Sequence, residues 1–510
     1  MEQQRASFYK QRVQYLIAAL FLFRCAVAFC IELGNDEAYY WLYNQGLAWN
    51  YFDHPPVVAL WTRIFTLNNL LPDHEVILRL GSIAGCGISS WFMYQTVLTL
   101  HSARAAFFAA CLYNASFYAG LTAGVYLMPD APQMVFWTLS LLMAARLTNG
   151  ATNWSSWILF GVAAGLAIMS KVHGVFIWGG MALYVVCFKR AWLLKPQVYV
   201  AAVVTLVLIS PILVWNLEYD FITYRFHSQR VTITEGSKGT NYMREFAGQI
   251  LFNNPVNVIL ALCGLIQLAR YKAARIPALA LYNFMALPLA GILLFVSFFR
   301  DTTLPHWSGP AYVSLIPLGA ITVAQIKKPA VFKRLHWVSL GLFILVLTAW
   351  CGIVNYYPGT TGSKEKMNLG RNDISLDVFG WKQAAEHFST IYKNDVEVGL
   401  AVPGTPLVSA YWWGAHVEYY FARPLQLPMV GLGPVQQVRH YLWTNASLQG
   451  INMQTAYCVM PVDEQYELPH QYYSGINLTH LISVKRNGQP AHDFRVYRLT
   501  GWKGVLPFIR

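Results

Sequence analysis

The sequence LIAALFLFRCAVAFC, residues 16–30, is followed directly by IELGNDEAYYWLYNQGLAWNYFDHPPVVALW, residues 31–61. The first stretch is part of an apolar run long enough for a membrane helix, which needs about 20 mostly apolar residues. The second stretch gathers acidic, aromatic and amide side chains and contains an Asp-His-Pro-Pro turn. Polar groups beside an apolar helix are costly unless they are hydrated, paired or bound to a cation. The junction therefore predicts the rim and floor of a cavity at a membrane surface.

The composition of the whole chain is that of a membrane protein. Of its 510 residues, 56% are hydrophobic and 12% are charged, against about 25% charged in ordinary soluble domains. The formal net charge of +13 lies in short basic clusters between apolar segments. This distribution is typical of membrane orientation signals and argues against nucleic-acid binding. The cysteines show no paired spacing of the kind that a disulfide or zinc framework needs.

Apolar windows of membrane-spanning length predict a polytopic α-helical membrane protein with about eleven transmembrane helices. Basic residues such as Lys189, Arg190 and Lys195 gather in alternate gaps, which places the first outer loop, residues 34–75, and the C-terminus outside. The expected helices are centred near Leu20, Gly87, Cys111, Leu139, Val162, Met181, Val204, Ile259, Leu289, Leu315 and Ile344.

The composition changes near residue 355, which divides the chain into a membrane region, residues 1–354, and a soluble region, residues 355–510. In the second region, helix-like segments (GWKQAAEHF and GPVQQVRHYLW) alternate with strand-like ones (VEVGLAV, PLVSAYW and DFRVYRL). Alternation of this kind favours a small α/β domain.

Carboxylates and aromatic rings gather in the first outer loop. Asp36 and Glu37 open it, and an aromatic run that includes Tyr40 follows. Ordinary interfacial acids and an aromatic belt would produce the same pattern. The rings are equally compatible with a stacking platform for sugars.

The FDHPP turn adds Asp53 and His54 before two prolines that fix the backbone. A rigidly held carboxylate and imidazole are candidate ligands for a divalent cation (Mg²⁺, Mn²⁺ or Zn²⁺) or candidate contacts for a phosphate. Two ligands do not complete a coordination sphere, so both alternatives stand.

Two charged residues belong to the ends of apolar helices. In MPDAPQMVFW, Asp130 begins a helix, where a carboxylate either merely complements the helix macrodipole or converges with Asp36 to hold an acceptor. In GLAIMSKVHGVF, Lys171 ends a helix, where an ammonium either snorkels to the interface or pairs with a lipid phosphate.

The later outer loops supply basic side chains. WNLEYDFITYRFHSQR contains Arg225 and Arg230, and FFRDTTLPHWSGPAY contains Arg300 and His306. A charge run is usually a solvated face, and this is the alternative reading for Arg225 and Arg230. Arg300 ends an apolar helix close to a Pro-His-Trp turn, which favours a role at the site.

In their order along the chain, these pieces resemble the GT-C class of membrane-embedded glycosyltransferases, which use polyprenyl-phosphate sugars. The class includes protein O-mannosyltransferases and lipid A aminoarabinose transferases. The resemblance rests on NDEAYYW with YFDHPP, MPDAPQMVFW, GLAIMSK, SPILVWNLEYDFITYRF and LPHWSGPAY, and it spans most of the membrane region. DVFGW, residues 377–381, is similar to a bacterial branch of the class. The resemblance implies a GT-C fold in a bacterial inner membrane, with the active site and the C-terminal α/β domain on the periplasmic side.

The resemblance also implies roles for single residues. Asp36 matches the key acid of the class, a general base in protein-modifying members and an acceptor-orienting group in others. Asp130 matches its second acid, Lys171 a lysine that contacts the donor phosphate, and Asp53 an acid implicated in divalent-cation binding. His54 stands where other members carry lysine. The remaining candidates for substrate binding are Glu37, Tyr40, His54, Arg225, Arg300 and His306.

The activity implied is inverting transfer of a sugar from a polyprenyl (undecaprenyl) phosphate donor to a cell-envelope acceptor, lipid A or another glycan. A protein O-mannosyltransferase-like enzyme is the alternative. A lipid or sugar transporter and a non-catalytic assembly protein are rivals from other classes, but transporter sites lie near the bilayer midplane, often between repeated halves, and this sequence shows no repeat. The expected partners are the donor, a lipid or glycan acceptor and membrane lipids, without nucleic acid.

Overall fold

The computed structural model describes residues 2–232, 239–270, 277–301, 303–325, 334–448, 450–463 and 470–504. The chain divides into two compact units. Unit 1 is Met1–Ala26 with Gly46–Leu347, and unit 2 is Val27–Gln45 with Thr348–Arg510. The composition predicted a single boundary near residue 355. In the structure, the acidic start of the first outer loop also belongs to the unit that contains the C-terminal residues.

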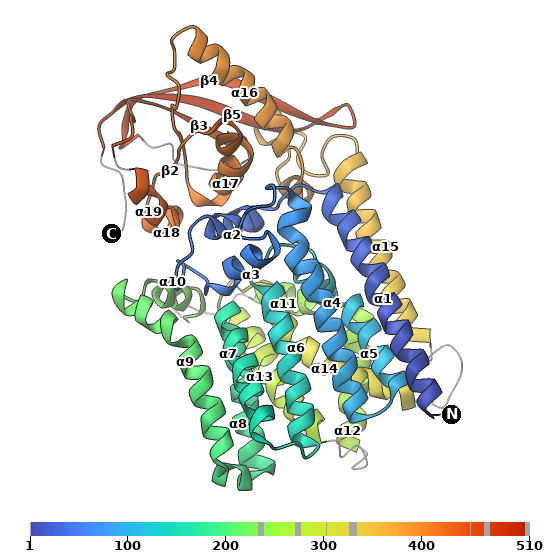
Figure 1. Ribbon diagram of the computed structural model, residues 1–510. Coiled ribbons are helices and arrows are strands. Elements are labelled where there is room, and N and C mark those ends of the chain that lie inside the picture. Colours follow the sequence, from blue (N-terminus) through green and yellow to red (C-terminus); the bar gives the residue numbers. More distant parts are fainter. Residues whose placement is uncertain are drawn as a thin grey trace. The chain divides into compact units, whose positions relative to one another are not determined.

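Unit 1 is a bundle of helices (Figure 1). Every predicted span centre lies inside a helix of the structure. The helices that contribute to this unit are α1 (Glu2–Cys30), α3 (Val57–Phe65), α4 (Glu75–Leu100), α5 (Ala103–Ala115), α6 (Asp130–Thr148), α7 (Trp154–Ser170), α8 (Val175–Phe188), α9 (Pro196–Glu218), α10 (Ile222–Val231), α11 (Gly239–Phe252), α12 (Pro255–Arg270), α13 (Pro277–Ser297), α14 (Gly309–Gln325) and α15 (Leu335–Tyr356).

The number of spans differs from the expectation. Among the described residues, six helices are long and apolar enough to cross a membrane, and a seventh span arises if the bent pair Asn241–Phe252 and Pro255–Gln267 counts as one. The prediction of about eleven is therefore not confirmed. Helices α5, α7 and α8 have 13, 17 and 14 residues, fewer than the roughly 20 that cross a bilayer upright.

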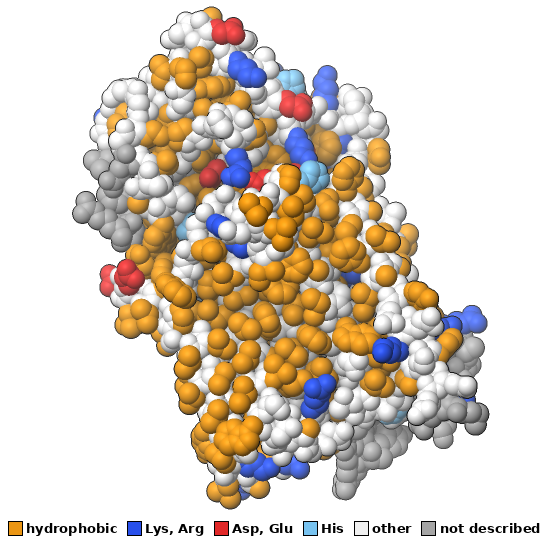
Figure 2. Space-filling model, in the orientation of Figure 1, with side chains coloured by type: hydrophobic (Ala, Val, Ile, Leu, Met, Phe, Trp, Pro, Cys, Tyr) orange, Lys and Arg blue, Asp and Glu red, His pale blue; other side chains and the backbone are white. Residues whose placement is uncertain are grey.

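The outward surface of unit 1 is largely apolar. Figure 2 shows hydrophobic side chains over most of the visible face of the bundle, with lysine and arginine side chains near one end. Leu206, Val207 and Leu213 of α9 are among the exposed large hydrophobic residues. An apolar surface of this extent is rare on a soluble monomer, and we interpret it as the surface that faces lipid.

A buried arginine stabilises the irregular backbone after α5. The chain there forms a π-helical turn, η1 (Tyr118–Thr122). Arg24 of α1 is 2% exposed, and its Nε donates to the Gly120 carbonyl oxygen at 2.9 Å. A Cβ at Gly120 would lie 2.6 Å from the Asn114 carbonyl oxygen, so glycine is required. The arginine satisfies a carbonyl that would be costly to leave unpaired in an apolar interior.

Unit 2 contains, among its described residues, a five-stranded mixed sheet of order β2-β1-β3-β5-β4. β1 pairs in parallel with β2 and β3, whereas β5 pairs antiparallel with β3 and β4. A C-terminal sheet domain is thus confirmed. Its strands are β1 (Leu407–Ser409), β2 (Met429–Gly431), β3 (Thr455–Pro461), β4 (Tyr473–Arg486) and β5 (Gln489–Trp502), and its helices are α2 (Asn35–Gln45), α16 (Trp381–Glu397), α17 (Tyr411–His416), α18 (Val435–Val438) and α19 (Tyr441–Thr444).

Three of the segment assignments in this unit were wrong or incomplete. Only Leu407–Ser409 of PLVSAYW forms a strand, because α17 begins at Tyr411. VEVGLAV is not a strand, because α16 continues to Glu397 and the following Val398 and Leu400 are 68% and 49% exposed, without a sheet to cover them. GPVQQVRHYLW is helical but divided into α18 and α19 at Arg439, whose φ is 50°. A short apolar pattern does not distinguish a strand from the exposed end of a helix.

A buried ion pair fixes the chain that enters the sheet of unit 2. Arg486, at the end of β4, is fully buried, and its Nη2 lies 2.9 Å from Asp373 Oδ2. Asp373 Oδ2 also accepts from Thr360 Oγ1 and from the Thr361 backbone nitrogen, both at 2.8 Å. Burial raises the pKa of Asp373, but hydrogen bonds from Ser375, Thr361 and Thr360 outweigh it and lower the pKa to about 2.

We expect Asp373→Asn to lower the free energy of unfolding of unit 2 by roughly 3–5 kcal/mol, because it leaves Arg486 buried without a counter-charge. Since the native pKa lies below the ordinary value of 3.8, the contribution of Asp373 is complete above about pH 4 and is lost as the pH falls towards about 2. Thermal unfolding of the full chain at several pH values, combined with protease sensitivity of unit 2, measures both effects. Glu386→Gln, which changes an exposed acid on α16, is the matched control; equal unfolding midpoints for the two variants would contradict this role of Asp373.

Candidate active site

Asp130 and Lys171 form a buried ion pair in unit 1. The Lys171 ammonium lies 2.9 Å from Asp130 Oδ1 and 2.8 Å from Oδ2, and the residues are 4% and 1% exposed. Asp130 is the first residue of α6, where a carboxylate also complements the helix macrodipole. Lys171 follows the last residue of α7 in an extended conformation. Each charge offsets the desolvation cost of the other, which would be high for either alone.

The backbone around Lys171 is held by the same helix that supplies its partner. Gln133 of α6 donates from Nε2 to the Lys171 carbonyl oxygen at 3.0 Å. The chain then turns through η2 (Val172–Gly174) into α8. A Cβ at Gly174 would lie 2.4 Å from the Ile168 backbone nitrogen, so this turn requires glycine. The first turn of α6 thus fixes both the ammonium and the main chain of Lys171.

A tyrosine completes the contacts of the carboxylate. Tyr118, in η1, is fully buried, and its hydroxyl donates to Asp130 Oδ1 at 2.8 Å. Gly309, at the start of α14, packs on the Tyr118 ring so closely that a Cβ there would lie 2.2 Å from a ring carbon. Asp130 is therefore held by groups from two separate segments and has no freedom to turn away from Lys171.

Three imidazoles interact electrostatically with the pair. His54, His173 and His306 each lie within electrostatic range of both Lys171 and Asp130. They come from the Asp-His-Pro-Pro turn, from η2 and from η4 (Pro305–Ser308). An imidazole offers a hydrogen-bond donor even when neutral. The cluster can therefore donate to an anion without adding much buried charge.

The Asp-His-Pro-Pro turn is held by a fourth histidine. His227 of α10 makes a 2.7 Å hydrogen bond from Nε2 to the Asp53 carbonyl oxygen, and its ring centroid lies 6.0 Å from that of His54. Burial, followed by the positive Lys171 and by His227, lowers the pKa of His54 well below its ordinary value. His54 is therefore neutral at pH 7.

The same turn was the predicted cation site. In the part of the chain that the structure describes, no group of three or more His, Cys, Asp or Glu side chains is arranged to hold a metal ion. Asp53 and His54 by themselves give an incomplete ligand set for Zn²⁺, Mg²⁺ or Mn²⁺. A divalent cation at this turn stays a prediction.

Two arginines make different contacts around α10. The Arg230 guanidinium lies 4.8 Å from the centroid of the Trp307 ring and interacts electrostatically with His306. Arg300 donates from Nη2 to the Gln229 carbonyl oxygen at 2.5 Å. Arg230 is thus the cation beside the cluster, whereas the described contacts of Arg300 include the end of α10.

Asp36, Glu37 and Tyr40 belong to unit 2, where all three lie on α2. Glu37 is 2% exposed, and its Oε2 accepts from the Gly34 backbone nitrogen at 2.9 Å, the reach-back contact of a helix capping box. Tyr40 is buried, with its ring centroid 5.7 Å from that of Tyr43. Asp36 is the partly exposed acid of this turn. Glu37 and Tyr40 therefore build the end of the helix that presents Asp36.

The structure brings together four of the residues expected at the site, Asp130, Lys171, His54 and His306. Arg225 is exposed on α10 and is not part of this group. The convergence of Asp36 with Asp130 stays a prediction, because the two acids belong to different units. Tyr118, His173 and His227 were not among the predicted site residues, whereas Arg230 was left open between a role at the site and a solvated face. The SKVHG pattern, with a histidine two residues after Lys171, is a local signal for His173.

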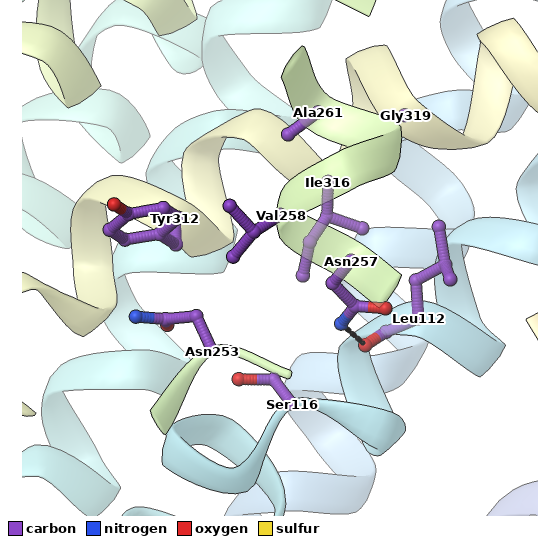
Figure 3. A pocket seen from close by; sticks show the side chains of 9 residues that line it. All are labelled: Leu112, Ser116, Asn253, Asn257, Val258, Ala261, Tyr312, Ile316 and Gly319. Atoms are coloured by element: carbon purple, nitrogen blue, oxygen red, sulfur yellow. Dashed lines mark hydrogen bonds between the residues drawn. The ribbon is translucent and has the colours of Figure 1, made fainter. Parts of the chain in front are cut away.

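A small cavity lies elsewhere in unit 1, among α5, α12 and α14 (Figure 3). Its volume is about 10 Å³, and its polar lining residues are Ser116, Asn253, Asn257 and Tyr312. Asn257 Nδ2 donates to the Leu112 carbonyl oxygen at 2.7 Å, whereas Asn253 Oδ1 has no partner among the described residues. A cavity of this size holds about one water molecule, so it is too small to be a sugar site.

Comparison with known sequences finds related proteins for part of the chain. Residues 53–215 match the family described as dolichyl-phosphate-mannose-protein mannosyltransferase, and this segment contains His54, Asp130 and Lys171. The lipid A galacturonosyltransferase RgtD of Rhizobium johnstonii is 24% identical over 213 residues, which cover 38% of this chain and 41% of that protein. The chain thus matches less than half the length of this relative.

Comparison with solved structures establishes the fold. ArnT from Cupriavidus metallidurans in the apo state is 14% identical with a TM-score of 0.61, over 94% of this chain and 97% of that one. The same protein bound to undecaprenyl phosphate gives 14% identity and a TM-score of 0.59, with the same coverage. The apo oligosaccharyltransferase of Archaeoglobus fulgidus is 11% identical with a TM-score of 0.50, over 88% of this chain and 70% of that one. These likenesses confirm the GT-C fold.

Removal of one charge of the Asp130–Lys171 pair is expected to destabilise unit 1 more than removal of both. Lys171→Met leaves Asp130 buried and uncompensated, a change that costs roughly 3–5 kcal/mol. Adding Asp130→Asn removes the stranded charge and should restore part of the loss. Thermal unfolding of the single and double variants in one detergent measures the coupling. Lys189→Met, at the exposed end of α8, is the control, and strictly additive effects of the two site variants would exclude the coupling.

Proposed function

We propose that the protein is an inverting glycosyltransferase that moves a sugar from a polyprenyl-phosphate donor to an acceptor of the cell envelope, at the periplasmic face of a bacterial inner membrane. The observation that carries this proposal is the buried Asp130–Lys171 pair, with three imidazoles that interact electrostatically with both of its charges. The match of residues 53–215 to a mannosyltransferase family supports the reaction. The likeness to an ArnT solved with undecaprenyl phosphate supports the class of donor.

The proposed role of the pair is to hold the donor phosphate. An ammonium has three N–H donors, and the contacts to Asp130 Oδ1 and Oδ2 use two of those of Lys171. The third is available to a phosphate oxygen. Because Asp130 and Tyr118 already orient the ammonium, little reorganisation is needed when the phosphate arrives. Asp130 thus acts by keeping Lys171 charged and in place.

The proposed reaction breaks the bond between the anomeric carbon and the phosphate oxygen. The acceptor oxygen attacks the anomeric carbon from the opposite face, and the bonding pair leaves with the polyprenyl phosphate. Negative charge develops on that phosphate, where Lys171, the imidazole N–H groups and the Arg230 guanidinium can stabilise it. The sugar is transferred with inversion.

The fate of the acceptor proton depends on the acceptor. If the acceptor is a hydroxyl, its proton moves to a carboxylate as the new bond forms, and we assign this role to Asp36. If the acceptor is a phosphate anion, no proton is removed and Asp36 orients the acceptor instead. The two cases differ in whether Asp36→Asn abolishes turnover or chiefly weakens acceptor binding.

We propose lipid A or another envelope glycan as the acceptor, because the chain is similar to a lipid A galacturonosyltransferase. A protein acceptor is the second candidate, favoured by the description of the family that residues 53–215 match. Mass spectrometry of envelope lipids, glycans and proteins from cells with the active chain and with Asp36→Asn separates them. A sugar-sized mass difference confined to one of these fractions identifies the acceptor.

Lys171→Ala is expected to lower turnover by more than about 10-fold, since it removes at least ~1.4 kcal/mol of stabilisation of the departing phosphate. The measurement is release of free polyprenyl phosphate by the full chain in lipid nanodiscs supplied with polyprenyl-phosphate sugars and envelope lipids. Lys189→Ala, which removes an exposed lysine from the same unit, should leave release unchanged. Full activity of Lys171→Ala would remove this residue from the mechanism.

A further inference from the structure

We propose that the DVFGW motif, Asp377–Trp381, is a positioning device for the acidic segment Glu32–Glu37, and that Asp377 acts on the reaction by setting the orientation of Asp36. This inference rests on the proposed function, because it concerns the acid to which that function assigns the acceptor. All residues involved belong to unit 2.

Three hydrogen bonds, each with at least one backbone group, join the motif to the acidic segment. The Glu32 backbone nitrogen donates to the Val378 carbonyl oxygen at 3.0 Å. In return, the Trp381 backbone nitrogen donates to Glu32 Oε2 at 2.7 Å. The Asn35 backbone nitrogen donates to Asp377 Oδ1 at 3.1 Å. These three bonds hold the segment on both sides of Leu33.

Asp377 has the position of a helix cap supplied from far along the chain. The first four backbone N–H groups of a helix have no partner within it, and α2 begins at Asn35. Glu37 caps the Gly34 nitrogen from inside the helix, and Asp377 accepts from Asn35. Asp36 is the next residue. Its backbone is therefore fixed by a carboxylate that is remote in sequence.

A second pair of side chains holds Leu33. The Leu33 backbone nitrogen donates to the Tyr420 hydroxyl at 2.7 Å, and His416 Nε2 lies 2.7 Å from the Leu33 carbonyl oxygen. Burial lowers the pKa of His416 to about 3, so the ring is neutral and Nε2–H donates. The His416 ring also stacks on Trp381 with centroids 4.0 Å apart. Leu33 is thus tied to the same motif through His416.

The carboxylates in this cluster interact. Burial, and then the charges of Asp36 and Glu37, raise the pKa of Asp377 to about 7 against the lowering effect of the Asn35 hydrogen bond. The space beside Gly34 is filled by Asp377, since a Cβ there would lie 2.9 Å from Asp377 Oδ2. A change in the charge of Asp377 near neutral pH therefore takes place in direct contact with the segment that carries Asp36.

The test compares variants at Asp377 in the full chain. Asp377→Ala removes the acceptor for the Asn35 amide, whereas Asp377→Asn keeps an acceptor oxygen and removes the charge. We expect Asp377→Ala to lower kcat by about 10- to 100-fold with KM for the donor changed less than about twofold, since small displacements of a catalytic group have effects of this size. Asp377→Asn should restore most of kcat. We also expect the wild-type kcat–pH profile to have an inflection near pH 7 that Asp377→Asn lacks.

Hydrogen exchange of the amides of residues 33–37 reports the contact without reference to activity. Asp377→Ala should accelerate exchange at Asn35, and Tyr420→Phe should accelerate it at Leu33. Tyr473→Phe is the matched control, because the Tyr473 hydroxyl in β4 has no hydrogen-bond partner among the described residues. It should change neither exchange nor turnover.

The outcomes separate the two proposals. If the wild-type chain transfers no sugar from any polyprenyl-phosphate donor but Asp377→Ala still accelerates exchange at Asn35, the proposed function is overturned and the positioning contact is supported. If the wild type is active and Asp377→Ala leaves both kcat and exchange unchanged, the positioning role is overturned. A loss of kcat that Asp377→Asn does not restore, with unchanged exchange, also overturns it.

Discussion

A lysine ammonium inside an apolar helical bundle requires an anion in contact with it. Lys171 meets this requirement through Asp130, and the geometry around the pair follows from it. The first turn of α6 must present the carboxylate at the point where α7 ends, and Gln133 ties the main chain of Lys171 to the same turn. Because the pair is neutral as a whole, the bundle can hold a charged donor group for phosphate at modest cost in desolvation.

Irregular backbone lies next to both groups of candidate residues. The π-helical turn η1 carries Tyr118, which contacts Asp130, and a second one, η8 (Val417–Ala422), carries Tyr420, which contacts Leu33. Such turns are rare and frequently found at functional sites. In η1, Arg24 donates to the Gly120 carbonyl oxygen and so satisfies a backbone group of the turn. In an apolar interior, irregular backbone persists only where other groups satisfy it.

Hydrogen bonds hold the acidic segment of the first outer loop. Its main-chain groups are bound one after another by side chains and carbonyls of residues that follow position 376 in the sequence. The consequence is that Asp36 is presented by a short helix with a fixed first turn. Rigid support of a short segment is what a group that must meet an acceptor oxygen needs, because an error in its position directly lowers the rate. In the proposed mechanism, the C-terminal residues hold the helix that carries Asp36.

The sequence alone determined which segments of this chain form apolar helices and which residues lie at the ends of those helices. Apolar content is local, so every expected helix centre lies within a helix. Helix-end position made Asp130 and Lys171 candidates, and the resemblance to the GT-C class gave them their expected roles. The number of spans was not determined, since helices such as α5 and α8 owe their apolar composition to packing inside the bundle as much as to lipid.

Only the tertiary structure decided which polar side chains contact one another. Some contacts join segments whose local sequence patterns do not predict that they meet. Examples are Tyr118 with Asp130, Arg230 with Trp307, and Asn35 with Asp377. The grouping of residues 27–45 with the C-terminal domain is of the same kind. The physical reason is that hydrophobic burial is set by local composition, whereas the pairing of polar groups depends on which surfaces come together when the helices and the sheet pack.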